Sequence, residues 1–138
     1  YPKKEAAMLP VLYLAQREFG HLSAEAIEYV AKIMDQPPAR VRGVVSFYTM
    51  YNTKPIGRHH IQICRTLPCA LGGAEKITAF IKKKLGIATG ETTADGRFTL
   101  SEVECLASCG TAPMMQVNDD YYENLTEENV DGILEGMK

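Results

Sequence analysis

The sequence HHIQICRTLPC at residues 59–69 combines a strand pattern with a close pair of cysteines. A second stretch of the same kind, FTLSEVECLASC, follows at residues 98–109. In both, a β-prone run leads into the first cysteine of a pair, so we expect each pair at a strand-to-turn junction. Strand ends are rigid positions from which a fold can present side chains to a site. The two stretches therefore predict a sheet whose strand ends carry the functional thiols.

The chain has four cysteines, which form two close pairs. Cys64 and Cys69 have the spacing C-x4-C, and Cys105 and Cys109 have the spacing C-x3-C. Four thiolates are enough for one metal centre, with none left over. An iron–sulfur cluster tolerates loops of this length, because each of its two irons can take one pair. We therefore favour a [2Fe–2S] cluster, on a scaffold other than the plant-type ferredoxin pattern.

Other thiol sites fit the spacing less well. Structural zinc is the second choice, because its pairs are usually C-x2-C. A disulfide framework suits small secreted domains that lack a core of this size, and a thioredoxin-type redox pair needs C-x-x-C. A Rieske centre would use His59 and His60, but adjacent strand residues point to opposite faces, so we expect both on the surface. Thr66 and Ser108 can donate hydrogen bonds to sulfur.

Length and charge limit the functional classes. With 138 residues, the chain can bury one good core and a small additional subdomain. Its net charge of −2 does not indicate a nucleic-acid partner. Residues 1–58 hold eight basic and five acidic side chains, and residues 59–138 hold seven basic and twelve acidic ones, which is typical of a soluble acidic surface. No stretch approaches the roughly 20 apolar residues of a membrane span. The first residue is Tyr1 rather than Met, which leaves room for an upstream segment that has been removed.

Apolar spacing, caps and turns predict two domains, residues 1–56 and residues 57–138. The first is expected to be a bundle of helices over 3–19, 24–35 and 39–48, with Pro10 either kinking the first helix or marking its start. The second is expected to order its elements as strand 59–64, helix 72–85, strands 98–105, 114–118 and 121–125, and helix 127–137. This order predicts an α+β fold, a small mixed sheet with helices against it.

The three helices could form a DNA-reading helix-turn-helix, but Arg40 and Arg42 are thin support for a basic recognition helix. We expect the helices to pack against a partner or against the sheet domain instead. The aromatic run at 47–51 is either core or interface.

Several motifs occur in a familiar order along nearly the whole chain. They are Leu9-Pro10-Val11-Leu12, Val44-Val45-Ser46-Phe47-Tyr48-Thr49-Met50-Tyr51, His60-Ile61-Gln62-Ile63-Cys64, Leu67-Pro68-Cys69, Leu85-Gly86-Ile87, Gly90-Glu91-Thr92-Thr93, Val103-Glu104-Cys105-Leu106, Cys109, Ala112-Pro113-Met114 and Val117-Asn118-Asp119. With these motifs the chain resembles the small [2Fe–2S] subunit of the NADH dehydrogenase module of respiratory complex I, NADH:quinone oxidoreductase. Related subunits of NAD-linked hydrogenases and formate dehydrogenases share the pattern.

The resemblance implies a thioredoxin-like ferredoxin domain, a mixed four-stranded sheet with flanking helices, behind a small helical bundle. It implies that Cys64, Cys69, Cys105 and Cys109 are the ligands of one [2Fe–2S] cluster. It also implies docking on a larger subunit that carries FMN and binds NADH. The location implied is peripheral, on the cytoplasmic side of the bacterial inner membrane or the matrix side of the mitochondrial one. In thioredoxin-like folds a cis-proline precedes the strand beside the active loop, which indicates a cis Ala112–Pro113 bond.

Two departures from the family pattern lie next to ligands. Arg65 stands where a small or polar residue is more common, and Ala107-Ser108 stands where Gly-Ala is common. Neither removes a ligand, and both bear on the cluster potential. Arg65 in particular predicts that its removal lowers the potential, because a cation favours the reduced, more negative state.

The chain has no motif for NADH oxidation on its own. It lacks G-x-G-x-x-G, and all its cysteines are committed as ligands, so we expect no catalytic residue and no flavin or NADH site in it. It is an oxidoreductase only as a subunit. The alternatives are the equivalent subunit of an NAD-linked hydrogenase or formate dehydrogenase, a free ferredoxin, which would not need the helical bundle, and a zinc-stapled interaction module.

Overall fold

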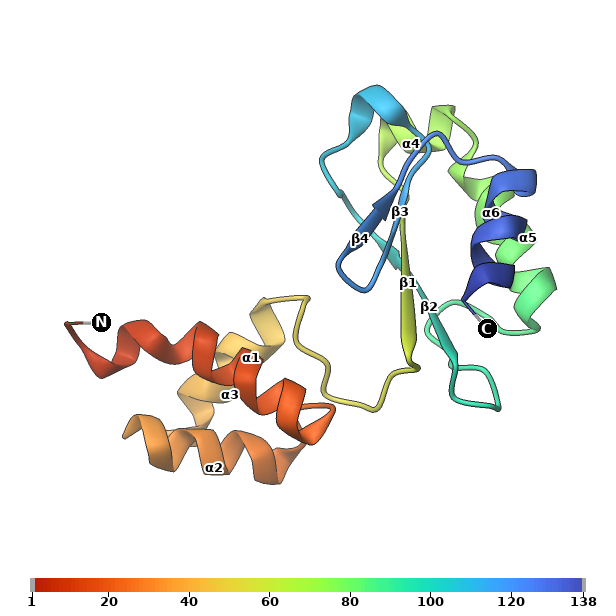
Figure 1. The fold of residues 1–138 in the computed structure, drawn as a ribbon. Helices are drawn as coiled ribbons and strands as arrows, with labels where there is room; N and C mark the ends of the chain where they lie inside the picture. Colours follow the sequence, from red (N-terminus) through yellow and green to blue (C-terminus); the bar gives the residue numbers. More distant parts are fainter. Residues whose placement is uncertain (1, 138) are drawn as a thin grey trace. The chain divides into compact units, whose positions relative to one another are not determined.

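The computed structural model of the protein describes residues 2–137. The chain divides into two compact units, one ending at Ile56 and the other beginning at Gly57 (Figure 1). Within the described residues, no helix has both the length and the apolar character needed to cross a membrane.

The first unit consists of short helices. They are the 3-10 helix Lys4–Ala7, α1 (Met8–Phe19), α2 (Ala24–Met34) and α3 (Pro38–Phe47). Pro10 lies in the first turn of α1, where backbone N–H groups have no partner within the helix. Of the two expectations for Pro10, the structure agrees with the one that places it at the start of the helix. Gly20, with φ of 79°, follows α1, and the Ser23 hydroxyl caps α2 by accepting the Ala26 N–H at 3.2 Å.

The core of the helical unit is apolar, and its fully buried members include Leu12, Leu22, Val30, Met34 and Val41. The aromatic run divides between core and surface. Tyr51 is buried and its hydroxyl donates to the Leu9 carbonyl at 2.8 Å, whereas Phe47 is 77% exposed. The run 47–51 was expected to be either core or interface, and neither expectation describes all of its residues.

The second unit contains a four-stranded sheet. Its strands are β1 (His59–Cys64), β2 (Phe98–Val103), β3 (Met115–Val117) and β4 (Asp120–Tyr122), in the order β2-β1-β3-β4. The β1–β2 pair is parallel, while β1–β3 and β3–β4 are antiparallel. The predicted mixed four-stranded sheet is confirmed.

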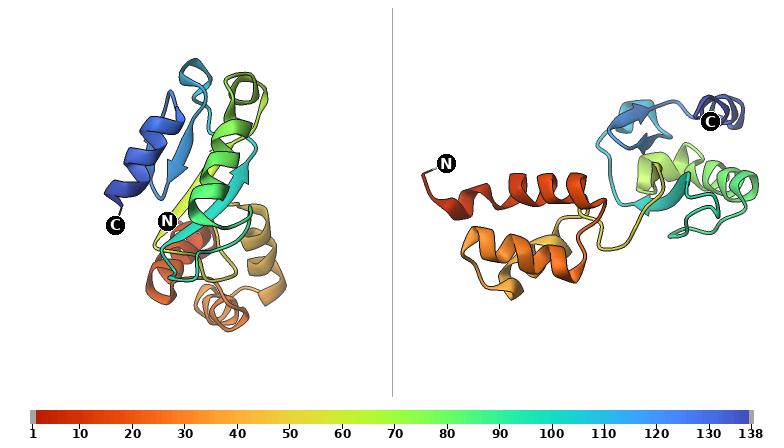
Figure 2. Two further views of the ribbon diagram at one scale, coloured as in Figure 1. Left: turned by 90° about the vertical axis from the view of Figure 1, so that its right-hand side faces the viewer. Right: turned by 60° about the horizontal axis from the view of Figure 1, so that its bottom comes forward.

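Helices accompany this sheet. They are α4 (Leu67–Leu71), α5 (Ala74–Leu85), the 3-10 helix Cys109–Thr111 and α6 (Glu127–Gly136). α5 and α6 lie side by side against one face of the sheet (Figures 1 and 2). Lys84 of α5 joins them through ion pairs with Asp131 and, at 3.2 Å, with Glu135. The core between sheet and helices includes Ile61, Ile63, Ile77, Ile81, Leu100, Met114, Met115 and Val130.

Several element boundaries differ from the prediction, and three of the differences lie near the cysteine-bearing loops. The helix predicted over 72–85 begins at Ala74, because Gly73 has a left-handed φ of 94°, and a separate helix α4 precedes it. The strand predicted over 98–105 ends at Val103, so Cys105 lies beyond it in a loop. The strand predicted over 121–125 ends at Tyr122, and Asn124 has a positive φ of 50°. Such turns depend on single residues, which periodicity does not reveal.

Candidate metal centre

The parallel pairing of β1 with β2 determines where the two cysteine pairs lie. Cys64, the last residue of β1, is in register with Val103, the last residue of β2. Cys105 follows two residues later. Because parallel strands end at the same edge of a sheet, Cys64 and the loop that begins after Val103 leave the sheet side by side. The Arg65 N–H donates to the Val103 carbonyl at 3.0 Å and extends the pairing past Cys64.

The first pair, Cys64 and Cys69, is built into the core. Each side chain is only 2% exposed. Cys69 lies in α4, whose first turn holds Pro68, a residue suited to that position. The sulfur of Cys64 is 3.1 Å from the Thr66 hydroxyl, so the expected hydroxyl contact to sulfur is present at Thr66.

The environment shifts the pKa values of these two thiols in opposite directions. Burial raises the pKa of Cys64, but hydrogen bonds from the Thr66 hydroxyl, from the Thr66 and Leu106 backbones and from Cys69 outweigh it, so that this pKa is lowered. Burial, the hydrogen bond to Cys64 and the charges of Cys64 and Cys109 raise the pKa of Cys69.

The second pair, Cys105 and Cys109, lies in an exposed loop. The Ala107 N–H donates to the Cys105 sulfur at 3.3 Å, and Ala107 has a positive φ of 59°. Cys109 begins the short 3-10 helix. Both residues of this pair are exposed, in contrast to the core position of Cys64 and Cys69.

An ion pair joins the two cysteine-bearing segments. The Arg65 guanidinium donates to one carboxylate oxygen of Glu104 at 3.1 Å from Nε and 2.7 Å from Nη2. The Cys64 sulfur lies 3.6 Å from the Glu104 carbonyl oxygen. Since Arg65 follows one expected ligand and Glu104 precedes another, the charge of Arg65 next to the site is compensated.

The exposed loop is fastened by the segment that follows β3. The Tyr121 hydroxyl donates to the Leu106 carbonyl at 3.0 Å, and the Asn124 N–H donates to the Thr111 carbonyl at 2.8 Å. The Glu123 carboxylate accepts the hydroxyl of Ser108, and also that of Thr111 at 2.6 Å.

These contacts correct one sequence-based expectation. The Ser108 hydroxyl, expected at sulfur, is directed to Glu123 instead. Its hydrogen bond and that of Thr111 lower the pKa of Glu123, because they favour the anion. Glu123 and Tyr121 could not be predicted as site residues, since no short-range pattern in the sequence links them to the cysteines.

Backbone contacts complete the edge of the site. The Ala112–Pro113 bond is cis, as expected. The Cys64 N–H approaches the Met114 carbonyl at 3.3 Å. A Cβ on Gly72, just after α4, would come within 3.1 Å of Pro113 Cδ, so a glycine permits this close approach.

His59 and His60 lie at the opposite end of β1 from Cys64. Both are half-buried rather than fully on the surface, which corrects the expectation. His60 Nε2 is 2.8 Å from the Ser101 hydroxyl, and burial lowers its pKa. The histidines are therefore separated along the strand from the cysteines, as a Rieske centre would not allow.

The donor set at the sheet edge consists of thiols. Soft thiolates suit iron–sulfur clusters and zinc, and one pair from each segment matches the two irons of a [2Fe–2S] cluster. Among residues 2–137, no group of three or more His, Cys, Asp or Glu side chains is arranged to hold a single metal ion.

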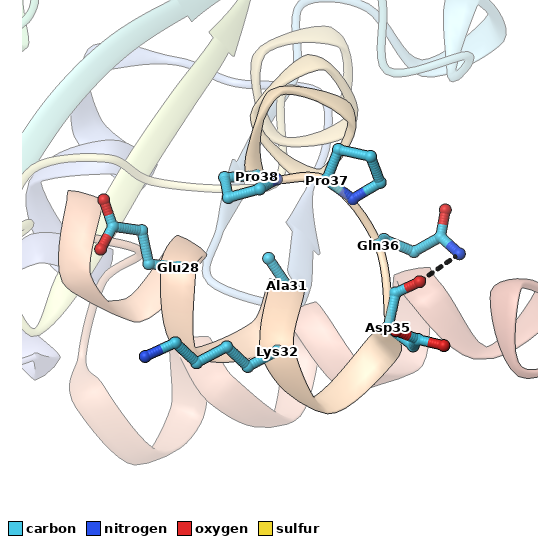
Figure 3. A pocket seen from close by; sticks show the side chains of 7 residues that line it. All are labelled: Glu28, Ala31, Lys32, Asp35, Gln36, Pro37 and Pro38. Carbon is cyan, nitrogen blue, oxygen red and sulfur yellow. Dashed lines mark hydrogen bonds between the residues drawn. The ribbon is translucent and has the colours of Figure 1, made fainter.

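Pockets of the helical unit offer no comparable chemistry. One of about 430 Å³ lies where α2 turns into α3, and is lined by Glu28, Ala31, Lys32, Asp35, Gln36, Pro37 and Pro38 (Figure 3). The Gln36 amide there donates to the Asp35 carbonyl at 2.9 Å. The charged side chains that line this pocket are the anions Glu28 and Asp35 and the cation Lys32, and the lining contains no thiol. The cysteine edge of the sheet is therefore the stronger candidate site.

Comparison with known proteins identifies relatives along the whole chain. The family model described as thioredoxin-like [2Fe-2S] ferredoxin matches residues 1–138. A protein of Rickettsia felis, named as a subunit of NADH-quinone oxidoreductase, is 50% identical over 133 residues, covering 96% of this chain and 80% of that protein. A protein of Rhizobium meliloti, also named as a subunit of NADH-quinone oxidoreductase, is 45% identical over 138 residues, covering 100% of this chain and 82% of that protein.

Among solved structures, an NAD+-reducing [NiFe]-hydrogenase in the air-oxidized state has a similar fold. It matches 95% of this chain with a TM-score of 0.83 and 21% identity, and the match covers 22% of the hydrogenase chain. At this identity the likeness concerns the fold.

Proposed function

Because the chain belongs to the thioredoxin-like [2Fe–2S] ferredoxin family, we propose that it is an electron-transfer subunit of an NADH:quinone oxidoreductase. In this proposal Cys64, Cys69, Cys105 and Cys109 hold one [2Fe–2S] cluster. The observation that carries it is that two thiol pairs leave the same edge of the sheet, from the neighbouring parallel strands β1 and β2. When bound, such a cluster accepts and releases one electron at a time.

The residues of the chain have distinct tasks in this function. Cys64 and Cys69 are buried with the core, which excludes water from one side of the site. The Thr66 hydroxyl lies against the Cys64 sulfur. Cys105 and Cys109 are exposed, which leaves the opposite side open to an electron-transfer partner.

Sequence similarity favours the quinone-linked parent complex. Relatives that are 45% and 50% identical over nearly the whole chain are named as subunits of NADH-quinone oxidoreductase. The hydrogenase likeness, at 21% identity, supports the shared fold. The equivalent subunit of an NAD-linked hydrogenase or formate dehydrogenase is therefore the second choice.

The partner in this proposal is a larger subunit that holds FMN and binds NADH. NADH gives up two electrons as hydride, and a flavin is the usual converter to single electrons. Residues 1–56 would act as a docking domain and residues 57–138 as the cluster domain. Exposed apolar side chains occur in both, including Leu14 at 60%, Phe47 at 77% and Leu71 at 81%. Assembly would place the chain peripherally, on the cytoplasmic or matrix side of the membrane.

Metal analysis of the pure chain tests the cluster. We expect two irons and two acid-labile sulfides per chain, with strong loss of both when any of the four cysteines is replaced by serine. Ser46→Ala, in the helical unit, is a control that should keep full content. One zinc and no sulfide would refute the proposal in favour of a zinc-stapled module.

Reduction by NADH tests the partner. The isolated chain should be reduced by dithionite, if its potential permits, and not at a useful rate by NADH. Addition of the FMN-bearing subunit should give a stable heterodimer in which reduction by NADH depends on the flavin. Rapid NADH reduction of the flavin-free chain would contradict the proposed division of labour.

A further inference from the structure

We propose that Glu123 is a positioning residue for the exposed ligand loop and lowers the reduction potential of the metal centre, a role that rests on the proposed function. Glu123 is outside both cysteine pairs, but its carboxylate accepts the hydroxyls of Ser108 and Thr111. These two residues flank Cys109, one directly before it and the other two residues after it. The carboxylate therefore holds both sides of one ligand.

The polar contacts form one connected group. The Ser108 and Thr111 hydroxyls are 2.7 Å apart, and the Thr111 hydroxyl is also 3.2 Å from the Ser108 carbonyl. Tyr121 and Asn124, on either side of Glu123, bond the Leu106 and Thr111 carbonyls. The segment 121–124 thus fastens the loop at several points, and Glu123 is its anionic member.

The sign of the effect follows from two physical causes. A fixed negative charge near the centre disfavours the reduced state, which carries one more negative charge. Both hydroxyls are also directed to the carboxylate, so they are withheld from the ligand sulfur, where a hydrogen bond would stabilise the reduced state. Both effects lower the potential.

The test compares variants of the full chain by redox titration followed in the visible spectrum. Glu123→Gln removes the charge and keeps a hydrogen-bond acceptor, whereas Glu123→Ala removes both. Asp95→Asn is the matched control, since Asp95 also accepts a hydroxyl, that of Thr93 at 2.6 Å. Asp95 precedes the start of β2, while Cys105 follows its end. At about 3.3 Å per residue the strand separates them by about 20 Å, beyond the Debye length of about 10 Å.

Because Glu123 is exposed, solvent screens its charge, and we expect Glu123→Gln to raise the equilibrium constant for one-electron reduction by about two- to threefold, tenfold being about 59 mV. Glu123→Ala should raise it at least as much, because it also frees the hydroxyls, and Asp95→Asn should leave it unchanged. In a Ser108→Ala/Thr111→Val background, the difference between Gln and Ala at position 123 should disappear. A titration reports only chains that hold a cluster, so partial loading does not hide the shift.

Iron and sulfide content, measured in parallel, distinguishes an effect of Glu123 on the reduction potential from an effect on cluster retention alone. Lower content at an unchanged potential would overturn the tuning role, as would complete loss of the cluster from Glu123→Gln. A shift equal to that of Asp95→Asn would also overturn it. If the unaltered chain held no iron and sulfide, the proposed function itself would fail, which is a different result from an unresponsive potential.

Discussion

The two cysteine-bearing segments differ in what holds them. Cys64 and Cys69 are 2% exposed and belong to the apolar core of the sheet unit. Cys105 and Cys109 are exposed, in a loop held by side-chain and backbone hydrogen bonds from residues 121–124. One half of the candidate site is therefore positioned by packing, and the other half by polar contacts.

This difference separates stability from function. Burial fixes side chains strongly, because any movement costs apolar contacts. Solvent-exposed hydrogen bonds contribute less to stability. We expect changes in the first segment to disturb folding, and changes in the second to alter the metal centre with little cost to the fold.

The largest expected effect tests the packed segment. Ile63→Ala should reduce the free energy of unfolding of the metal-free chain by about 2–5 kcal/mol, because Ile63 is 1% exposed and its loss leaves a cavity. Leu67→Ala, at a side chain that is 70% exposed, should change it by less than about 0.5 kcal/mol. Denaturant titration measures both. Equal losses would show that the core does not position this segment.

The next effect compares one cysteine from each segment in the metal-free chain. Cys69→Ser places a hydroxyl in the core and should reduce the free energy of unfolding by about 1–3 kcal/mol. Cys105→Ser, in the exposed loop, should change it by less than about 0.5 kcal/mol. Thermal unfolding of the metal-free proteins measures the difference. A larger loss for Cys105→Ser would reverse the comparison.

A smaller effect concerns the two hydroxyls beside the proposed ligands. Thr66→Val removes the contact at 3.1 Å to the Cys64 sulfur and should disfavour one-electron reduction by about 1 kcal/mol, roughly fivefold. Thr66→Ser keeps the hydroxyl and serves as control. Ser108→Ala should not disfavour reduction, because its hydroxyl is directed to Glu123. Redox titration measures the reduction potential of each variant. Equal shifts in potential for Thr66→Val and Ser108→Ala would contradict the different roles assigned to the two hydroxyls.

The smallest effect concerns the ion pair that joins the segments. Arg65→Ala should still lower the potential, and Glu104→Gln should raise it. The side chains are 58% and 76% exposed, so solvent screening should keep each effect below about 1 kcal/mol. The double variant should return close to the potential of the unaltered chain. A raised potential in Arg65→Ala would refute the electrostatic argument.

Much of the fold follows from local sequence. The alternating apolar run before Cys64 predicts β1, and the Ser23 and Thr126 caps predict the starts of α2 and α6. The order of the elements predicts the mixed sheet, and the family resemblance predicts its thioredoxin-like form. The boundaries around the site were less predictable. α4 and the early end of β2 depend on Gly73 and on the turn after Val103.

The sequence alone determined which residues are the candidates for the proposed chemistry, because four thiols in two close pairs define a possible donor set whatever the fold. It also determined the class of fold, since periodicity and caps act over short distances along the chain. Tertiary structure decided which pair is buried and which is exposed. It also decided that Arg65 pairs with Glu104, 39 residues away, and that Ser108 bonds Glu123, 15 residues away. Such contacts arise when β1 and β2 become neighbours and the loop folds onto the segment after β3, and no local pattern encodes them.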